Sequence, residues 1–325
     1  MTKTNPMDRL YERLEEAGVA PSYVRDYVLP EWWDDEIAQS GTGRLEGLGY
    51  ISKFLGIDVS TLRDSEASLQ APDVAGARYK LRSDVDYEDV TWAQSLCVRA
   101  AEIAAHAIPT PYRPLDSTTA QEIRTPILNA GAPCVSLKHL LRFCWDSGIP
   151  VLHVPEVPGR KMDGIALQAN GRPAIVISKN HKHDAWLLFI LAHELGHIAS
   201  GHLKGQEVWI DEEYSPNPTG NHEQEANQFA AELVTREICF ELDPYVKASE
   251  LARRARAFGE QCKVHPGAVV LNFAFHDDGN PWRLANATLN TLYPDAEAAK
   301  FFRRAILNRI DWTALPEESA AFLAR

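Results

Sequence analysis

Apolar residues recur at helical spacing along most of the chain and change to strand-like runs only in its middle part. The first part predicts short helices, from a charged amphipathic segment at 7–18 to a longer one at 87–107. Residues 135–145 predict another helix, and the runs VLHV, GIALQ and PAIVIS that follow predict short strands separated by turns. The pattern therefore predicts an α+β fold that is mostly helical, with a small antiparallel sheet.

The proline-bearing stretch 109–114 is the strongest signal for a domain boundary. A length of 325 residues also suits two domains, or one domain with helical additions. We expect a helical N-terminal domain over 1–115, a second domain over 116–280 and a C-terminal helical extension over 281–325.

Within the N-terminal part, ISKFLGIDVSTLRD at 51–64 resembles the helix-turn-helix of phage-repressor-like domains, with Gly56 at the turn. The second helix offers Arg63, but Asp64 and Glu66 beside it complement a phosphate backbone poorly. Two interpretations stay open, a DNA-reading element or a helical packing or sensor domain of the same ancestry.

Composition and charge narrow the function classes. An apolar content of 45% and a charged content of 24% are typical of globular proteins and exclude general disorder or a fibre. The formal net charge of −12 argues against a surface built for broad contact with duplex DNA. The five cysteines include no C-x-x-C pair, and no long apolar segment is present, so we expect a cytoplasmic protein without membrane contact.

The segment DAWLLFILAHELGHIASGHL, at 184–203, contains the motif H-E-x-x-H. Helical spacing puts His193 and His197 on one stripe, one turn apart, which is the geometry of two ligands for one metal ion. Glu194 lies beside that stripe, where its carboxylate is placed to take a proton from water activated by zinc. The motif thus predicts a catalytic Zn²⁺ site.

A hydrolytic zinc site takes three protein ligands and leaves one position for water, so a third ligand is required. The predicted helix NHEQEANQFAAELV, at 221–234, offers Glu223 and Glu225. Both lie at similar angles from its buried face, so periodicity alone barely separates them. Asn227, one turn beyond Glu223, would either orient a ligand histidine or face solvent.

The stretch 148–266, with FILAHELGHIASGH and HEQEANQFAAELV, resembles the ImmA/IrrE family of bacterial metallopeptidases, which are thermolysin-like zinc proteases. In that family the third ligand is the Glu of an E-x-x-x-N/D pattern, which here matches Glu223 and Asn227. The resemblance implies a zincin domain whose sheet packs on the active-site helix. It also implies that His193, His197 and Glu223 bind the metal and that Glu194 is catalytic.

The resemblance further implies an endopeptidase that cleaves a helix-turn-helix repressor encoded nearby, in a DNA-damage, mobile-element or antiphage response. One alternative is a DNA- or partner-binding regulator whose metal site is structural. Another is a peptidase or amidase that acts on small peptides. Glu194 favours an enzyme, because a purely structural site needs no general base.

Several other groups are candidates for supporting roles. Tyr214 and His222 are candidates for stabilising the oxyanion, by proximity alone. His202, five residues beyond His197, is expected to point elsewhere on the helix and is interpreted as structural. The basic and aromatic group at 300–309 suits either stacking on single-stranded DNA, as an activator, or an amphipathic helix packed on the body.

Cys97 is a candidate inhibitory ligand, because it lies on the amphipathic helix predicted at 87–107. A thiolate binds zinc better than water does, so docking of this helix over the site would place the sulfur in the fourth position. The alternative is an ordinary buried thiol in the core.

Overall fold

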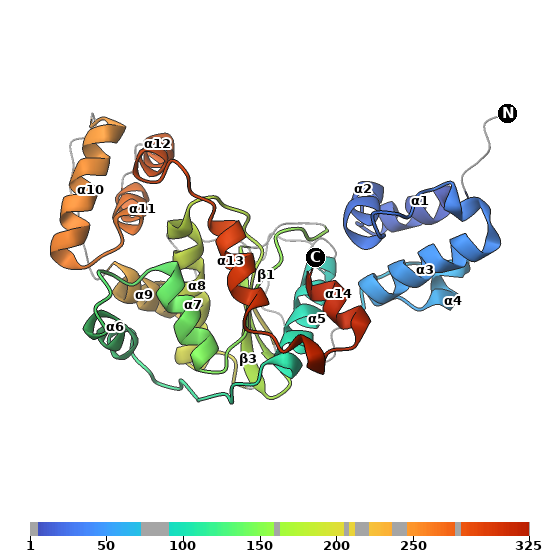
Figure 1. The fold of residues 1–325 in the computed structure, drawn as a ribbon, viewed down its shortest axis with the longest axis horizontal. Helices are drawn as coiled ribbons and strands as arrows, with labels where there is room; N and C mark the ends of the chain where they lie inside the picture. Colours follow the sequence, from blue (N-terminus) through green and yellow to red (C-terminus); the bar gives the residue numbers. More distant parts are fainter. Residues whose placement is uncertain are drawn as a thin grey trace.

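The computed structural model describes residues 6–72, 91–158, 163–204, 208–211, 221–235, 246–276 and 281–324. Helices dominate these residues, and a small four-stranded sheet lies near the middle of the elongated molecule (Figure 1). The predicted α+β class is therefore confirmed. Among the described residues, no helix is long and apolar enough to cross a membrane.

The N-terminal helices pack around a hydrophobic core of their own. They are α1 (Asp8–Glu16), α2 (Pro21–Tyr23), the π-helix η1 (Val24–Val28), the 3-10 helix η2 (Ile37–Gln39), α3 (Gly41–Leu55) and α4 (Val59–Arg63). Gly56 ends α3 with a positive φ of 74°, a left-handed conformation that glycine adopts without strain. The predicted pair of helices joined at Gly56 is thus present, although α4 is only 5 residues long.

The sheet has the strand order β1-β3-β2-β4, with strands β1 (Val151–His153), β2 (Gly164–Ala169), β3 (Arg172–Ile177) and β4 (Val208–Asp211). Strands β2 and β3 form a hairpin whose turn residues, Asn170 and Gly171, both have positive φ, as a type I′ turn requires. Strand β1 pairs with β3 in parallel, so the expectation of a purely antiparallel sheet is wrong. The reason is that β1 and β2 are not neighbours, since β3 lies between them, parallel to β1 and antiparallel to β2.

The two faces of the sheet are covered by different helices. Helix α8 (Asp184–Ala199) packs on one face and α5 (Thr91–Ala107) on the other (Figure 1). Helix α5 also joins the two cores, because Trp92 lies in the N-terminal core while Cys97 lies in the core of the sheet. The domain boundaries near residues 115 and 280 stay a prediction.

The remaining helices surround α8 or extend the chain away from it. They are α6 (Ala120–Asn129), α7 (Leu137–Asp146), α9 (Asn221–Val234), α10 (Ala248–Cys262), α11 (Pro266–His276), α12 (Trp282–Leu292), α13 (Ala298–Leu307), the 3-10 helix η4 (Trp312–Ala314) and α14 (Glu317–Ala324). Helices α10, α11 and α12 share a third core. Helix α14 returns to the N-terminal helices, where the ring centroids of Phe322 and Phe54 lie 5.0 Å apart.

A buried arginine fixes the end of α9. Arg124 of α6 is 1% exposed, and its guanidinium donates to the carbonyl oxygens of Leu233 at 2.8 Å and Lys263 at 2.6 Å. These carbonyls lie at the C-terminal ends of α9 and α10, where helices leave acceptors unsatisfied. Arg124 therefore holds α9, which carries Glu223, at a set position against its neighbours.

Candidate metal centre

Helix α8 holds the central residues of the site in a buried environment. His193, Glu194 and His197 are 2%, 1% and 0% exposed. Helix α9 packs closely against α8 at Gly196, where an added Cβ would lie 3.1 Å from the Cα of Ala226. The absence of a side chain at Gly196 thus allows the close approach that brings the two helices, and their polar groups, together.

Three of the predicted ligand residues converge on one point. The Nε2 atoms of His193 and His197 lie 3.0 Å apart. The Glu223 carboxylate approaches both rings, with Oε2 at 3.3 Å from His193 Nε2 and Oε1 at 3.5 Å from His197 Nε2. One ligand atom from each residue can be chosen so that all lie within 4.8 Å of one another. Two imidazoles and a carboxylate in this arrangement suit a single divalent metal ion.

Burial and mutual contacts set the protonation of these groups. Burial is the main cause that lowers the pKa of His197 to about 4, so its imidazole is neutral near pH 7, as a metal ligand must be. Burial opposes ionisation of Glu223, but its close contacts with the rings of His193 and His197 outweigh that effect and hold its pKa well below the usual range. At neutral pH the site therefore presents the neutral imidazole of His197 and the carboxylate of Glu223.

The far side of each candidate ligand ring, at Nδ1, has a partner. Asn227 Oδ1 lies 2.8 Å from His193 Nδ1, where the amide oxygen accepts the ring proton. Asn227 thus lies at the ligand histidine that it would orient, and not free in solvent. His197 Nδ1 lies 2.9 Å from His202 Nδ1. Both rings consequently keep Nε2 directed at Glu223.

The expectation that His202 points elsewhere is wrong, because the helix ends before it. Helix α8 stops at Ala199, and Gly201 takes a φ of 75°. The backbone N–H of Gly201 donates to Ile198 O at 3.1 Å, and that of His202 donates to His197 O at 3.0 Å. These two bonds form a Schellman motif, which turns the chain back over the last helical turn. Glycine two residues after the helix end is the signal that sequence reasoning overlooked.

Glu194 lies against the start of β2. A Cβ on Gly164 would lie 2.6 Å from Glu194 Oε1 and 2.9 Å from the Cγ2 atom of Ile190. Only a residue without a side chain leaves room for the carboxylate in its present position. The first residue of β2 therefore limits where Glu194 can lie.

We expect Gly164→Ala to lower kcat by roughly 10- to 100-fold while metal content stays unchanged, because the added methyl group displaces the Glu194 carboxylate. Steady-state kinetics together with metal analysis measure both quantities. Gly49→Ala on α3 is the matched control, since a Cβ there has nothing within 4 Å. Wild-type kcat in folded Gly164→Ala would show that Glu194 does not depend on this contact.

Cys97 does not lie near the three candidate metal ligands. Its sulfur is fully buried and lies 3.8 Å from Ser178 Oγ, on the face of the sheet that α5 covers. Gly164 faces α8, and so does Ile177, its partner on β3. Because successive residues of an extended chain point to opposite faces, Ser178, which follows Ile177, faces the other side of the sheet. Burial raises the pKa of the Cys97 thiol to about 12. The inhibitory role of Cys97 stays a prediction, and it requires a different placement of α5.

The other candidates are placed as follows. Tyr214 lies outside the described residues. His222 stacks on His202 with ring centroids 4.2 Å apart, and Glu225 Oε2 lies 2.8 Å from His202 Nε2. Glu225 thus contacts the outer histidine, whereas Glu223 faces the two inner ones.

Helix α13 and the two residues that follow it carry the basic and aromatic group at 300–309. Phe302 is fully buried, while Phe301 is 41% exposed. Lys300 pairs with Glu297, and Arg309 pairs with Asp146 at 2.8 Å. This is the arrangement of an amphipathic helix packed on the body, and single-stranded DNA binding stays a prediction.

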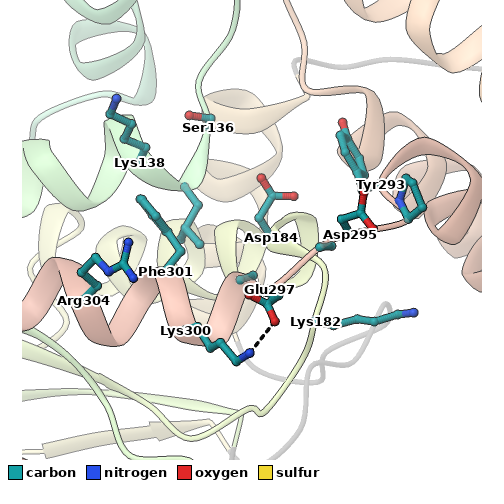
Figure 2. A pocket seen from close by; sticks show the side chains of 14 residues that line it. Ser136, Lys138, Lys182, Asp184, Tyr293, Asp295, Glu297, Lys300, Phe301 and Arg304 are labelled. Atoms are coloured by element: carbon teal, nitrogen blue, oxygen red, sulfur yellow. Dashed lines mark hydrogen bonds and ion pairs between the residues drawn. The ribbon is translucent and has the colours of Figure 1, made fainter.

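A separate cavity of about 650 Å³ lies where the first turns of α7 and α8 meet the start of α13 (Figure 2). Figure 2 shows Asp184, Lys300 and Arg304 around it, with the ion pair of Lys300 and Glu297 at its edge. None of the three converging ligand residues lines it. Its wall carries both charges, so it does not select one class of charged ligand.

Comparison with known proteins agrees with this site. Residues 146–264 match the Peptidase_M78 family, described as an IrrE N-terminal-like domain. The match spans the sheet and both helices that carry the metal-ligand candidates. No match was found among curated proteins or among solved structures. The resemblance to the ImmA/IrrE metallopeptidases is therefore confirmed, and residues 146–264 match the domain of that metallopeptidase family.

Proposed function

We propose that the protein is a zinc-dependent endopeptidase. The observation that carries this proposal is the convergence of His193, His197 and Glu223 on one buried point, with Glu194 next to them in α8. Two histidines and one carboxylate are a ligand set typical of catalytic zinc in peptidases, in which the fourth position is left open. A structural zinc site, by contrast, usually has four protein ligands.

The donor set fits zinc. Both imidazoles present Nε2 toward the point where the carboxylate ends, and the acceptor at each Nδ1 keeps that ring orientation. Bound zinc supplies a Lewis acid that polarises a peptide carbonyl and lowers the pKa of water toward about 7. Glu194 accepts the proton of the attacking water and delivers it to the leaving amine nitrogen. Its burial at 1% exposure keeps bulk water from competing for that proton.

We further propose that the substrate is a folded regulatory protein, namely a helix-turn-helix repressor in a DNA-damage, mobile-element or antiphage response. The proposal is supported by the IrrE N-terminal-like domain and by the helical N-terminal part with its α3–α4 pair. Single-stranded DNA is the proposed activator, supported by the exposed Phe301 among the basic residues of α13.

The decisive experiment incubates the full chain, loaded with one equivalent of zinc, with a helix-turn-helix repressor whose gene lies close to that of this protein. We expect cleavage at one or a few bonds, inhibition by a chelator, and faster cleavage when single-stranded DNA is added. An unstructured peptide library in a parallel reaction tests the small-peptide alternative. Tight zinc binding without cleavage of either substrate would favour the regulator with a structural metal site. Equal rates with and without DNA, over a range of salt, would remove the proposed activator.

A further inference from the structure

We propose that His202 and Glu225 together position the metal ligand His197 and thereby strengthen metal binding. This role rests on the proposed zinc site, and it belongs to two residues outside the ligand set. His202 follows α8, and Glu225 lies on α9, so the pair also connects the two helices that supply the ligands.

A chain of two hydrogen bonds runs outward from His197. Its Nδ1 lies 2.9 Å from His202 Nδ1, and His202 Nε2 lies 2.8 Å from Glu225 Oε2. A ring nitrogen that binds a metal carries no proton, so the His197 proton resides on Nδ1 and is donated to His202. The His202 proton then resides on Nε2 and is donated to the Glu225 carboxylate. In this chain His197 Nδ1 and His202 Nε2 are donors and His202 Nδ1 is an acceptor, so every donor faces an acceptor.

The ring of His202 is held from several sides. It is 7% exposed, and its backbone N–H donates to His197 O at 3.0 Å in the turn formed by Gly201. The ring of His222 stacks on it, with the two planes at 24°. A residue that is held this firmly by its own backbone and by stacking can restrict the ring to which it is hydrogen-bonded.

The two ligand histidines therefore have unequal support. His193 donates to the neutral amide oxygen of Asn227, whereas His197 donates to a histidine that is itself bonded to a carboxylate. A carboxylate at the end of such a chain pulls the bonded proton outward and makes the inner nitrogen a stronger electron donor to a metal. We therefore expect the pair to contribute to affinity through His197 in particular.

His202 is not a further metal ligand in this arrangement. One of its ring nitrogens faces His197 and the other faces Glu225, while Glu223 approaches the Nε2 atoms of the two ligands. The exposed side chain of Glu225 contacts His202 from the solvent side. Truncation of the Glu225 side chain therefore leaves the packing between α8 and α9 intact.

The test measures zinc affinity of the full chain at fixed pH by competition with a chromophoric chelator. We expect His202→Phe and Glu225→Ala each to weaken zinc binding about 10- to 100-fold, and Glu225→Gln to fall between Glu225→Ala and wild type, because its amide still accepts a hydrogen bond. Glu232→Gln is the matched control, since Glu232 lies on the same helix and bonds only Gln228 among the contacts of the described residues. The melting temperature of the metal-free variants shows that each is folded.

A double variant separates positioning from general packing. If Glu225 acts through His202, Glu225→Ala has little further effect on affinity once His202 is Phe, so the two losses do not add. Additive losses, or affinities within twofold of wild type in folded variants, would overturn the proposal. Failure of the proposed function is distinguishable, because it appears as wild-type protein that binds zinc but cleaves nothing, while the affinity differences remain measurable.

Discussion

Replacement of Glu194 by Gln is expected to abolish turnover while the protein keeps its metal. Glutamine has nearly the shape of glutamate but cannot accept a proton from water, so general-base catalysis is lost. Such catalysis typically accounts for a factor of 10² to 10⁴, and we expect a loss of about 10³-fold in kcat. The measurement pairs kcat on the cleaved repressor with zinc content per chain.

The position of Glu194 allows this experiment to separate loss of turnover from loss of metal. The carboxylate is not among the residues whose ligand atoms converge, so its neutralisation should leave zinc content at the wild-type level. Glu260→Gln on α10 serves as a matched control, because Glu260 is an exposed glutamate on a helix outside the site. Wild-type turnover in Glu194→Gln would assign the proton transfer to another group, and loss of zinc would make Glu194 part of the metal site.

Removal of Glu223 is expected to have an equally large effect through the metal itself. Glu223→Ala leaves only two histidines at the centre, and we expect less than about a tenth of the wild-type zinc to remain after dialysis. Turnover should fall with the zinc content. Elemental analysis of the dialysed protein provides the measurement, with circular dichroism as the check that α9 is still folded.

Glu225→Ala is the informative comparison, because helical periodicity alone left both carboxylates open and the choice of Glu223 came from the family resemblance. The outer contact of Glu225 with His202 predicts weaker affinity but one zinc per chain when zinc is in excess. The opposite outcome, with full occupancy in Glu223→Ala and none in Glu225→Ala, would assign the ligand to Glu225 and reject the geometry described above.

Local patterns were sufficient for most of the elements and for the centre of the site. Helical periodicity predicts α7, α8 and α9, and the short apolar runs predict β1, β2 and β3, because these signals depend on neighbours a few residues apart. The spacing of His193 and His197 by itself places both rings on one side of a helix. Such features need no knowledge of the rest of the chain.

Features that depend on distant contacts were decided only by the tertiary structure. The parallel pairing of β1, the contact of Glu225 with His202, and the placement of Cys97 across the sheet each depend on how separate segments meet. The direction of the His202 side chain was also beyond local sequence patterns, although His202 is only five residues from His197. Extending the helix past Ala199 predicts the wrong direction for its ring. Helical periodicity predicts side-chain directions only as far as the helix continues. Here the helix ends in a turn that depends on the left-handed conformation of Gly201, and that turn brings His202 back to His197.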